Sequence, residues 1–296
     1  MTNTRTATWA NIGTNVEDCN NNIDSILAEA ELNYNVISRP AYTEVDGQKI
    51  ELPNHHVVLR ESDNHVYQVA KNSYNICQNR DAFSIVEEFG DDIKVVKAGE
   101  CPNGMVYLIG EMPEIKVLDD TFKPHVILQN SHNADFALKS AIVPLRVVCQ
   151  NQFNVAFREA GNSFTIKHTS TIGSRIANMN EMLKGATEYL TEFNRNAEQL
   201  AVKKVDFNKF VAQLFPDNDE MTERQLAKVE ENRQTMLTAY NEADNANFKG
   251  TAWGIMNAAM DYDTHRKSRG GDQSRFINTV VFPTFARDVY NMLQAA

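Results

Sequence analysis

Four pairs of β-prone apolar runs, each pair joined by a short turn, constrain the fold of this chain more than any other feature. The runs AYTEV and QKIEL flank Asp46-Gly47, a dipeptide that supplies the positive φ angles of a tight hairpin. The other pairs are HVVLR with HVYQVA, IKVVKA with MVYLIGEM, and HVILQN with ALKSAIVPLRVV. Residues 34–148 are therefore predicted to be mainly antiparallel sheet, with one short helix inserted at DAFSIVEEFG.

Helical patterns flank this sheet. Thr14 followed by Glu17 makes a capping box, and the apolar stripe behind it predicts a helix over 15–32. Beyond Cys149 only SFTIKHT looks like a strand, and apolar residues spaced alternately by four and three form a heptad seam over 172–200. Such a seam can pair with another subunit or lie across its own sheet. We favour the second, because small residues along the seam permit close packing. Further helices are predicted at 206–214, 221–241, 251–261 and 284–294.

The predicted fold class is α+β. A mainly antiparallel sheet with an inserted helix is followed by a mainly helical C-terminal half, with one long helix packed on the sheet. We assign residues 1–170 to the sheet-rich core and 171–296 to the helical region packed on it. The segment THRKSRGGDQSR, 264–275, is basic and rich in glycine and serine, a composition typical of a mobile loop.

The composition limits the classes of protein to which this chain could belong. The chain has 296 residues, of which 42% are hydrophobic, and no run approaches the roughly 20 apolar residues of a membrane span. No signal core follows the N-terminus, so we expect a cytoplasmic protein with no membrane partner. The four cysteines lack the close spacing of a zinc knuckle or redox motif. A net charge of −10 argues against indiscriminate coating of nucleic acid, yet 139–209 and 264–296 are basic islands.

The sequence gives little evidence of a catalytic site or a metal site. His55, His56 and His65 flank a predicted hairpin with Asp63, but strand alternation sends His55 and His56 to opposite faces. Phosphate-binding loops and dinucleotide glycine patterns are absent. The sequence therefore predicts no metal, no cofactor and no catalytic residue, and it favours a protein other than an enzyme.

Polar residues follow the ends of several predicted strands. Asn130 and His132 follow one strand, Arg146 another, and Lys167 and His168 a third. Neighbouring strands would bring these groups to one rim, within a basic island. Arginine and lysine there would attract phosphates, and amides would donate hydrogen bonds to them. In the alternative interpretation the asparagines cap turns, which we favour for Asn151. The structural polar motif comprises Asn130, His132, Cys149 and Asn151.

The blocks QNSHNA, RVVCQNQF, IKHTSTIGSRI and GTAWGIMNAAMDYDTH resemble the phage/plasmid-like protein family of unknown function, whose members are scattered through bacteriophages, prophages and plasmids. The likeness covers nearly the whole chain, from Trp9 and Gly13 to the tryptophan helix at 253. Gln152 departs from it, since family members more often carry a small hydroxylated residue there. The resemblance implies a mobile-element protein and brings no established activity.

Three functional hypotheses follow. The leading one is a homo-oligomeric protein that binds single-stranded DNA and promotes strand annealing in recombination or replication, similar in outline to phage annealing proteins. Its phosphate contacts are predicted at Arg146, Lys167, His168 and Arg175, with Arg266, Lys267 and Arg269 as a flexible clamp. The alternative is an oligomeric counter-defence protein whose acidic surface inhibits a host defence complex. A third is a hydrolase that uses Cys149 with His168, although a cysteine after two valines is more typical of a buried hydrophobe.

Overall fold

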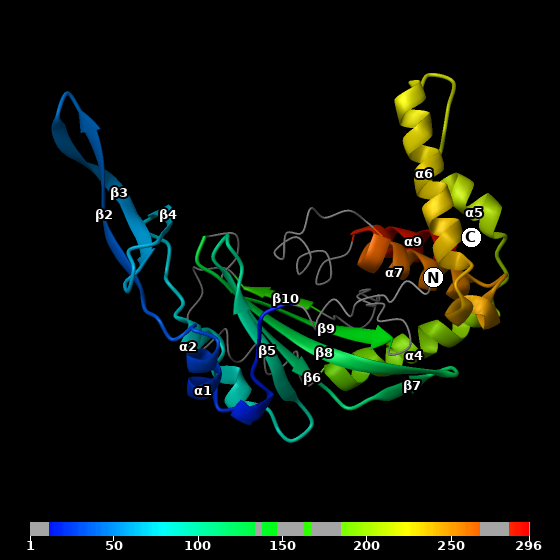
Figure 1. Cartoon of the computed structure of the whole chain (residues 1–296), viewed down its shortest axis with the longest axis horizontal. Coiled ribbons are helices and arrows are strands. Elements are labelled where there is room, and N and C mark those ends of the chain that lie inside the picture. The colour runs from blue at the N-terminus through cyan, green and yellow to red at the C-terminus, as the bar shows by residue number, and fades with distance from the viewer. Residues whose placement is uncertain (1–11, 134–137, 147–162, 167–184, 267–283, 296) are drawn as a thin grey trace.

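The structure is a computed structural model that describes residues 12–133, 138–146, 163–166, 185–266 and 284–295 (Figure 1). Within these residues the strands lie mainly in the N-terminal half and the helices mainly in the C-terminal half. The predicted α+β class is confirmed. The proposed division at residue 170 falls outside the described residues and stays a prediction.

The helix predicted over 15–32 is largely wrong. Strand β1 spans Thr14–Asn15, a 3-10 turn η2 spans Glu17–Cys19, and helix α1 occupies only Ile23–Glu29. Asn20 and Asn21 both have positive φ angles, 51° and 59°, and a left-handed residue cannot continue a right-handed helix. The actual cap is Asn22, whose side chain accepts a hydrogen bond from the Ser25 amide.

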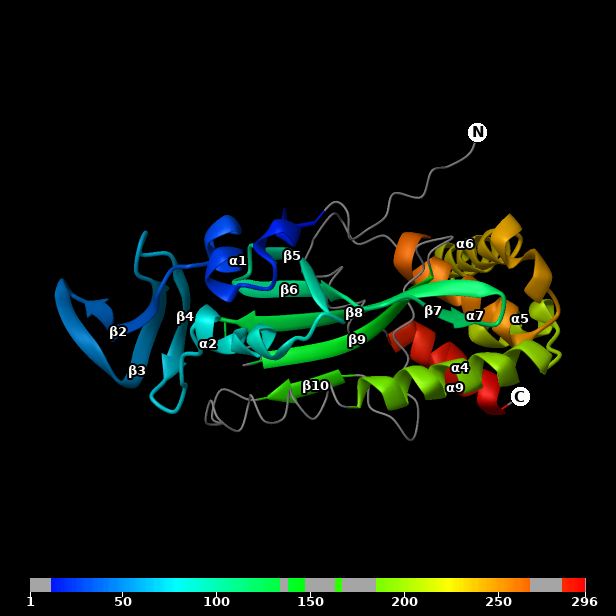
Figure 2. The same ribbon diagram turned by 90° about the horizontal axis from the view of Figure 1, so that it is seen from below.

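Three strands form a small sheet that projects from one end of the molecule (Figures 1 and 2). They are β2 (Val36–Val45), β3 (Gln48–Arg60) and β4 (Val66–Lys71), in the order β2-β3-β4. We call this sheet the arm. Asp46 and Gly47 have φ angles of 50° and 77°, the pattern of a type I′ turn. The two predicted hairpins of this region are confirmed.

After the short helical segments α2 (Asn79–Ala82) and η3 (Ser84–Glu88), the chain builds an antiparallel main sheet. Its strand order is β1-β5-β6-β8-β9-β10, with β7 paired to β8. The strands are β5 (Lys94–Glu100), β6 (Met105–Glu111), β7 (Ile115–Val117), β8 (Asp120–Ser131), β9 (Leu138–Arg146) and β10 (Ser163–Ile166). The predicted hairpins β5-β6 and β8-β9 are confirmed, whereas the three-residue strand β7 was missed.

Both faces of the main sheet are buried. On one face, Val106, Leu108 and Leu128 join a large core with the helices. On the other, Tyr107, Ile109 and Ile127 belong to a second apolar cluster. Burial on both faces explains why β6 reads as a nearly continuous apolar run rather than an alternating one.

Helices α4 (Ala186–Val202) and α7 (Ala252–Asp261) pack on the first face (Figure 2). The ring of Phe193 on α4 lies 5.2 Å from Phe122 on β8 and 6.2 Å from Trp253 on α7, centroid to centroid. The preference for packing of the heptad seam on its own sheet is therefore confirmed over α4. The earlier part of the seam, 172–184, lies outside the described residues.

The remaining helical segments lie in the C-terminal half, where side-chain caps begin several of the helices. The segments are α5 (Phe207–Leu214), α6 (Glu223–Tyr240), the 3-10 helix η4 (Ala243–Phe248), the π-helix η5 (Tyr262–Arg266) and α9 (Thr284–Ala295). Asp206 and Thr251 cap α5 and α7, and Thr222 forms a full capping box with Gln225. None of the described helices has both the length and the apolar character to cross a bilayer.

Candidate functional site

Two of the sequence motifs meet at one rim of the main sheet. Strand β8 ends at Ser131 and β10 ends at Ile166, and cross-strand register pairs Asn130 with Leu138 and Leu138 with Ile166. The C-terminal ends of β8 and β10 therefore lie at the same end of the sheet. We call this end, defined by Asn130, Ser131, His132, Leu138 and Ile166, the β8 rim. Lys167 and His168 follow Ile166 in sequence but lie outside the described residues.

Arg146 is at the opposite end of the sheet, which corrects the expectation of a single rim. Its backbone pairs with Phe122, near the start of β8. Arg146 lies eight residue steps along β9 from Leu138, a strand length of roughly 26 Å. Neighbouring antiparallel strands run in opposite directions, so the end of β9 cannot coincide with the ends of β8 and β10.

The side chains of Asn130 and His132 belong to a buried hydrogen-bond network. The Nδ2 atom of Asn130 donates to the Cys77 carbonyl at 3.0 Å and to Asn79 Oδ1 at 3.2 Å. The Nε2 atom of His132 lies 3.0 Å from the same Asn79 oxygen, which can only accept, so Nε2 carries the proton. Asn79 in turn donates to the Leu32 carbonyl at 3.0 Å. All three polar side chains are buried, so they hold the rim rather than present it to a ligand.

The arm is attached at this same rim. Gln68 on β4 donates to the His132 carbonyl at 2.8 Å. The ring of Tyr67 lies 5.1 Å from the ring of His132. The turn between β5 and β6 also contacts His132. The Gly104 carbonyl in this turn accepts a hydrogen bond from the His132 amide at 3.1 Å. The orientation of the arm is thus tied to the residue that ends β8.

A charged cluster completes this junction. The Nη2 atom of Arg60 donates to both carboxylate oxygens of Glu100, and its guanidinium lies 4.3 Å from the centre of the Tyr34 ring. The hydroxyl of Tyr67 donates to Glu100 at 3.0 Å. Burial, the neighbouring Tyr34 hydroxyl and the negative charge of Glu100 raise the pKa of Tyr67 far above its usual value. The Tyr67 hydroxyl therefore keeps its proton and remains a donor.

The arm itself is unusual in its exposed surface. Most of the large apolar side chains that are exposed in the described residues lie on it: Tyr42, Val45, Ile50, Val66 and Val69. Lys49 places its ammonium 4.1 Å from the centre of the Tyr42 ring, near the tip. A projecting element with apolar and cationic side chains in water is typical of an interaction surface.

Arg266 belongs to a different region and already has partners. Its guanidinium donates to Glu242 at 2.6 Å and also to Asp261. Arg266 ends a π-helix with Thr264, which is 4% exposed, so the first residues of the predicted mobile loop are ordered and packed. Any phosphate contact of Arg266 would compete with two carboxylates of its own chain.

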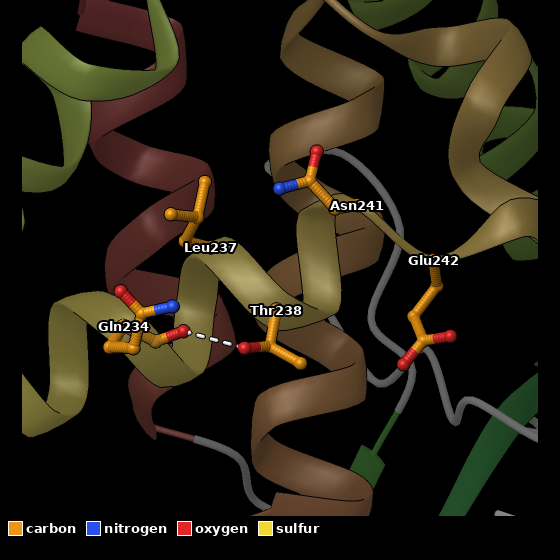
Figure 3. A pocket seen from close by; sticks show the side chains of 5 residues that line it. All are labelled: Gln234, Leu237, Thr238, Asn241 and Glu242. Atoms are coloured by element: carbon orange, nitrogen blue, oxygen red, sulfur yellow. Dashed lines mark hydrogen bonds between the residues drawn. The ribbon is translucent and has the colours of Figure 1, made fainter. Parts of the chain in front are cut away.

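A pocket of about 390 Å³ lies at the end of α6 (Figure 3), and Glu242, the partner of Arg266, is part of its lining. Its lining residues are Gln234, Leu237, Thr238, Asn241 and Glu242. Thr238 Oγ1 donates to the Gln234 carbonyl of its own helix at 2.9 Å. The polar groups point in different directions (Figure 3). We therefore assign no ligand to this pocket.

The described residues contain no group of three or more histidine, cysteine or acidic side chains placed to hold a metal ion. The other predicted site residues, Cys149, Asn151, Arg175, Lys267 and Arg269, lie outside the described residues and stay predictions. The sequence reasoning missed Arg60 and Glu100, and it did not connect Tyr67 with them. No local pattern marks these three residues, since Arg60 and Glu100 are 40 positions apart. The available hint was an arginine at the end of a predicted strand.

Comparison with known proteins places the chain in one family. No curated protein and no solved structure matches it significantly. The family model described as a domain of unknown function, DUF932, matches residues 66–294. The match takes in β4, every strand of the main sheet except β1, and the described helices from α2 onward, and it therefore includes the β8 rim. Because it covers well over half of the sequence, the chain belongs to the DUF932 family.

Proposed function

We propose that the protein binds single-stranded nucleic acid at the β8 rim, as a strand-handling factor in the recombination or replication of a phage or other mobile element. One observation carries the proposal, the register that aligns Asn130, Leu138 and Ile166. It supports convergence of the basic pair Lys167-His168, next in sequence after Ile166, with the motif that ends β8. The buried motif would then hold the rim, and the basic pair would contact the nucleic-acid strand.

The described chemistry of the rim suits this role. Lys139 is half-buried on β9, beside Leu138 at the same end of the sheet. Cations at such an edge attract phosphates without reading sequence. The buried network of Asn79, Asn130 and His132 fixes the strand ends, so cations placed on them would be held in a constant geometry. Preorganisation of this kind lowers the entropy lost on binding.

Fluorescence anisotropy tests the proposal. A labelled single-stranded oligonucleotide and its duplex are titrated at low and near-physiological salt. Preferential binding of the single strand, weakening steeply as salt rises, is expected because cations that contact phosphates release counterions. Absence of binding at low salt, or equal binding of the duplex, would overturn the proposal.

A protein partner is the second candidate function, and the exposed apolar residues of the arm favour it. Val66 and Val69 are each 54% exposed on β4, and acidic residues outnumber basic ones in the described part of the chain. A counter-defence protein would use such surfaces to engage a host complex. Recovery of one stoichiometric host protein from a nuclease-treated lysate, with no strand binding by the purified protein, would select this candidate.

A further inference from the structure

The tip of the arm leaves one edge of β3 without a neighbouring strand. On one side, β2 pairs with β3 from Gln48 to Arg60, with an irregularity opposite Ala41. On the other side, β4 pairs with β3 only from His55 to Leu59. In the part of the chain that the structure describes, no strand lies beside residues 48–53 on the β4 side. An open edge of this kind is a template for another strand.

The hairpin turn determines which backbone groups face this open edge. Val45 and Gln48 close the two-residue type I′ turn and form a hydrogen-bonded pair. Hydrogen-bonded and non-hydrogen-bonded pairs alternate along an antiparallel ladder. Lys49 and Glu51 therefore occupy non-hydrogen-bonded positions opposite β2. Their amide and carbonyl groups point outward, toward the open edge.

The sequence of this edge is complementary to itself. We propose that β3 of one copy pairs antiparallel with β3 of a second copy, with the two-fold axis at Ile50. In that register each Lys49 lies opposite Glu51 of the second copy, so two pairs of opposite charge flank the axis. The same two pairs exchange four backbone hydrogen bonds. The arms then form a continuous sheet in the order β2-β3-β3-β2.

Charge selects this register over its neighbours. A two-fold axis at Lys49 would oppose the two lysines, and an axis at Glu51 would oppose the two glutamates. Like charges directly opposite each other destabilise a sheet. The axis at Ile50 also brings together two side chains that are each 47% exposed in the single chain. Pro53 lacks an amide hydrogen and ends the ladder on one side.

This inference goes beyond the proposed function and does not depend on it. The single-chain structure already directs Lys49 and Glu51 to one face of the arm, because neighbours two apart on a strand share a face. Both residues are exposed, so their replacement leaves the core untouched. A second copy of this chain is therefore the partner that the edge fits by charge, by backbone groups and by apolar contact.

Charge reversal in the full-length protein tests the pairing. Wild type is expected to sediment as a dimer. Lys49→Glu and Glu51→Lys are each expected to weaken dimerisation at least tenfold, because each places two like charges across the axis. The double variant is expected to dimerise again. An equimolar mixture of the two single variants is expected to form a heterodimer, since every pair across its axis is then of opposite charge.

Each contrary result overturns the proposal. A monomeric wild type excludes the pairing, and single variants that dimerise like wild type place any dimer elsewhere. Single variants that stay apart when mixed would show that the substitutions act within one arm. Circular dichroism of each variant verifies that the fold is retained.

A cysteine at the axis gives an independent readout. The two Ile50 residues would form a non-hydrogen-bonded pair with Cα atoms about 4.5 Å apart, which is within the range that a disulfide spans. Ile50→Cys is expected to yield a covalent dimer under mild oxidation. Val45→Cys, at a similarly exposed tip position (51%) away from the axis, is the matched control. Equal cross-linking of both variants would contradict the register.

Discussion

The guanidinium of Arg60 and the carboxylate of Glu100 join the arm to the main sheet, with Nη2 3.1 and 3.0 Å from the two carboxylate oxygens. Arg60 lies on β3 and Glu100 ends β5. Their side chains are only 22% and 18% exposed. Because the pair is largely shielded from water, it holds the orientation of the arm relative to the main sheet far more strongly than a surface ion pair would.

Glu100→Gln is expected to loosen the arm. The amide removes the negative charge and leaves the shielded Arg60 with only the more distant carboxylate of Asp63, at 3.7 Å, a loss of about 1–3 kcal/mol in the free energy of unfolding. Hydrogen exchange of β2, β3 and β4 should quicken more than that of β6 and β8. Glu231→Gln is the matched control, because Glu231 pairs with Lys228 at 2.8 Å on the exposed face of α6. Equal effects of the two substitutions would contradict the role of the junction.

Gly104→Ala is expected to disturb the same junction by steric conflict. A Cβ atom at Gly104 would lie 2.6 Å from Cδ1 of Tyr67, and its φ is +78°. Gly250 has nearly the same φ, +77°, with no atom within 4 Å of the added carbon. Gly250→Ala therefore isolates the backbone cost, about 1–2 kcal/mol. Urea unfolding should show that Gly104→Ala lowers the free energy of unfolding by at least about 1 kcal/mol more than Gly250→Ala does. Equal losses in the two variants would contradict the steric conflict.

Glu111 makes the stability of the main sheet depend on pH. Its carboxylate faces His125 across the β6-β8 pair and lies 2.5 Å from the Lys123 ammonium. His125, followed by Lys123, lowers the pKa of Glu111 to about 2. A depressed pKa in the folded state stabilises the protein above the unfolded pKa, and that stability is lost as pH falls toward 2.

Comparison with Glu111→Gln checks this pH dependence. Wild type should be more stable by about 1–3 kcal/mol at about pH 5, and the difference should shrink steadily toward about pH 2. Urea unfolding of both proteins across this range measures it. A difference that stays constant with pH would show that Glu111 acts through packing alone.

Phe193→Ala is expected to destabilise both halves of the chain together. Phe193 is 2% exposed and lies between Phe122 of the sheet and Trp253 of α7. The cavity should cost about 3–5 kcal/mol, and Phe193→Leu less. Trp253 fluorescence and far-ultraviolet circular dichroism should report one shared transition. Two separate transitions, of which only one shifts, would mean that the helical region folds apart from the sheet.

Local chemistry explains which parts of the fold could be predicted from sequence. Asp46-Gly47 fixes its hairpin through its own φ angles, and Thr222 with Gln225 sets the start of α6 through two hydrogen bonds between residues three positions apart. Each signal acts over a few residues. The prediction of the first helix over 15–32 was wrong because Asn20 and Asn21 adopt left-handed backbone conformations, which end a helix despite the apolar stripe. Strand β7 was missed because its turn uses Leu118, with φ 57°, where no glycine or asparagine marks it.

The candidate site could be predicted only in part, because its geometry depends on strand direction and distant contacts. Asn130, His132 and the end of β10 do share a rim, but Arg146 ends a strand that runs the other way. The network around Asn79 joins residues more than 50 positions apart. The arm projects as a separate sheet, so its strands are exposed on both faces near the tip, and a hairpin pattern alone does not reveal this.

The proposed role of the β8 rim is tested most directly by two charge reversals, one at Lys167 and one at Arg146. Lys167 follows the rim in sequence, whereas Arg146 lies at the opposite end of β9. Each is replaced by glutamate. Anisotropy with a single strand of about four nucleotides, whose reach is below the roughly 26 Å between the two ends of β9, compares the two variants. The account predicts that Lys167→Glu weakens binding about tenfold and flattens its salt dependence, while Arg146→Glu stays near wild type. Equal losses, or a larger loss for Arg146→Glu, would contradict it.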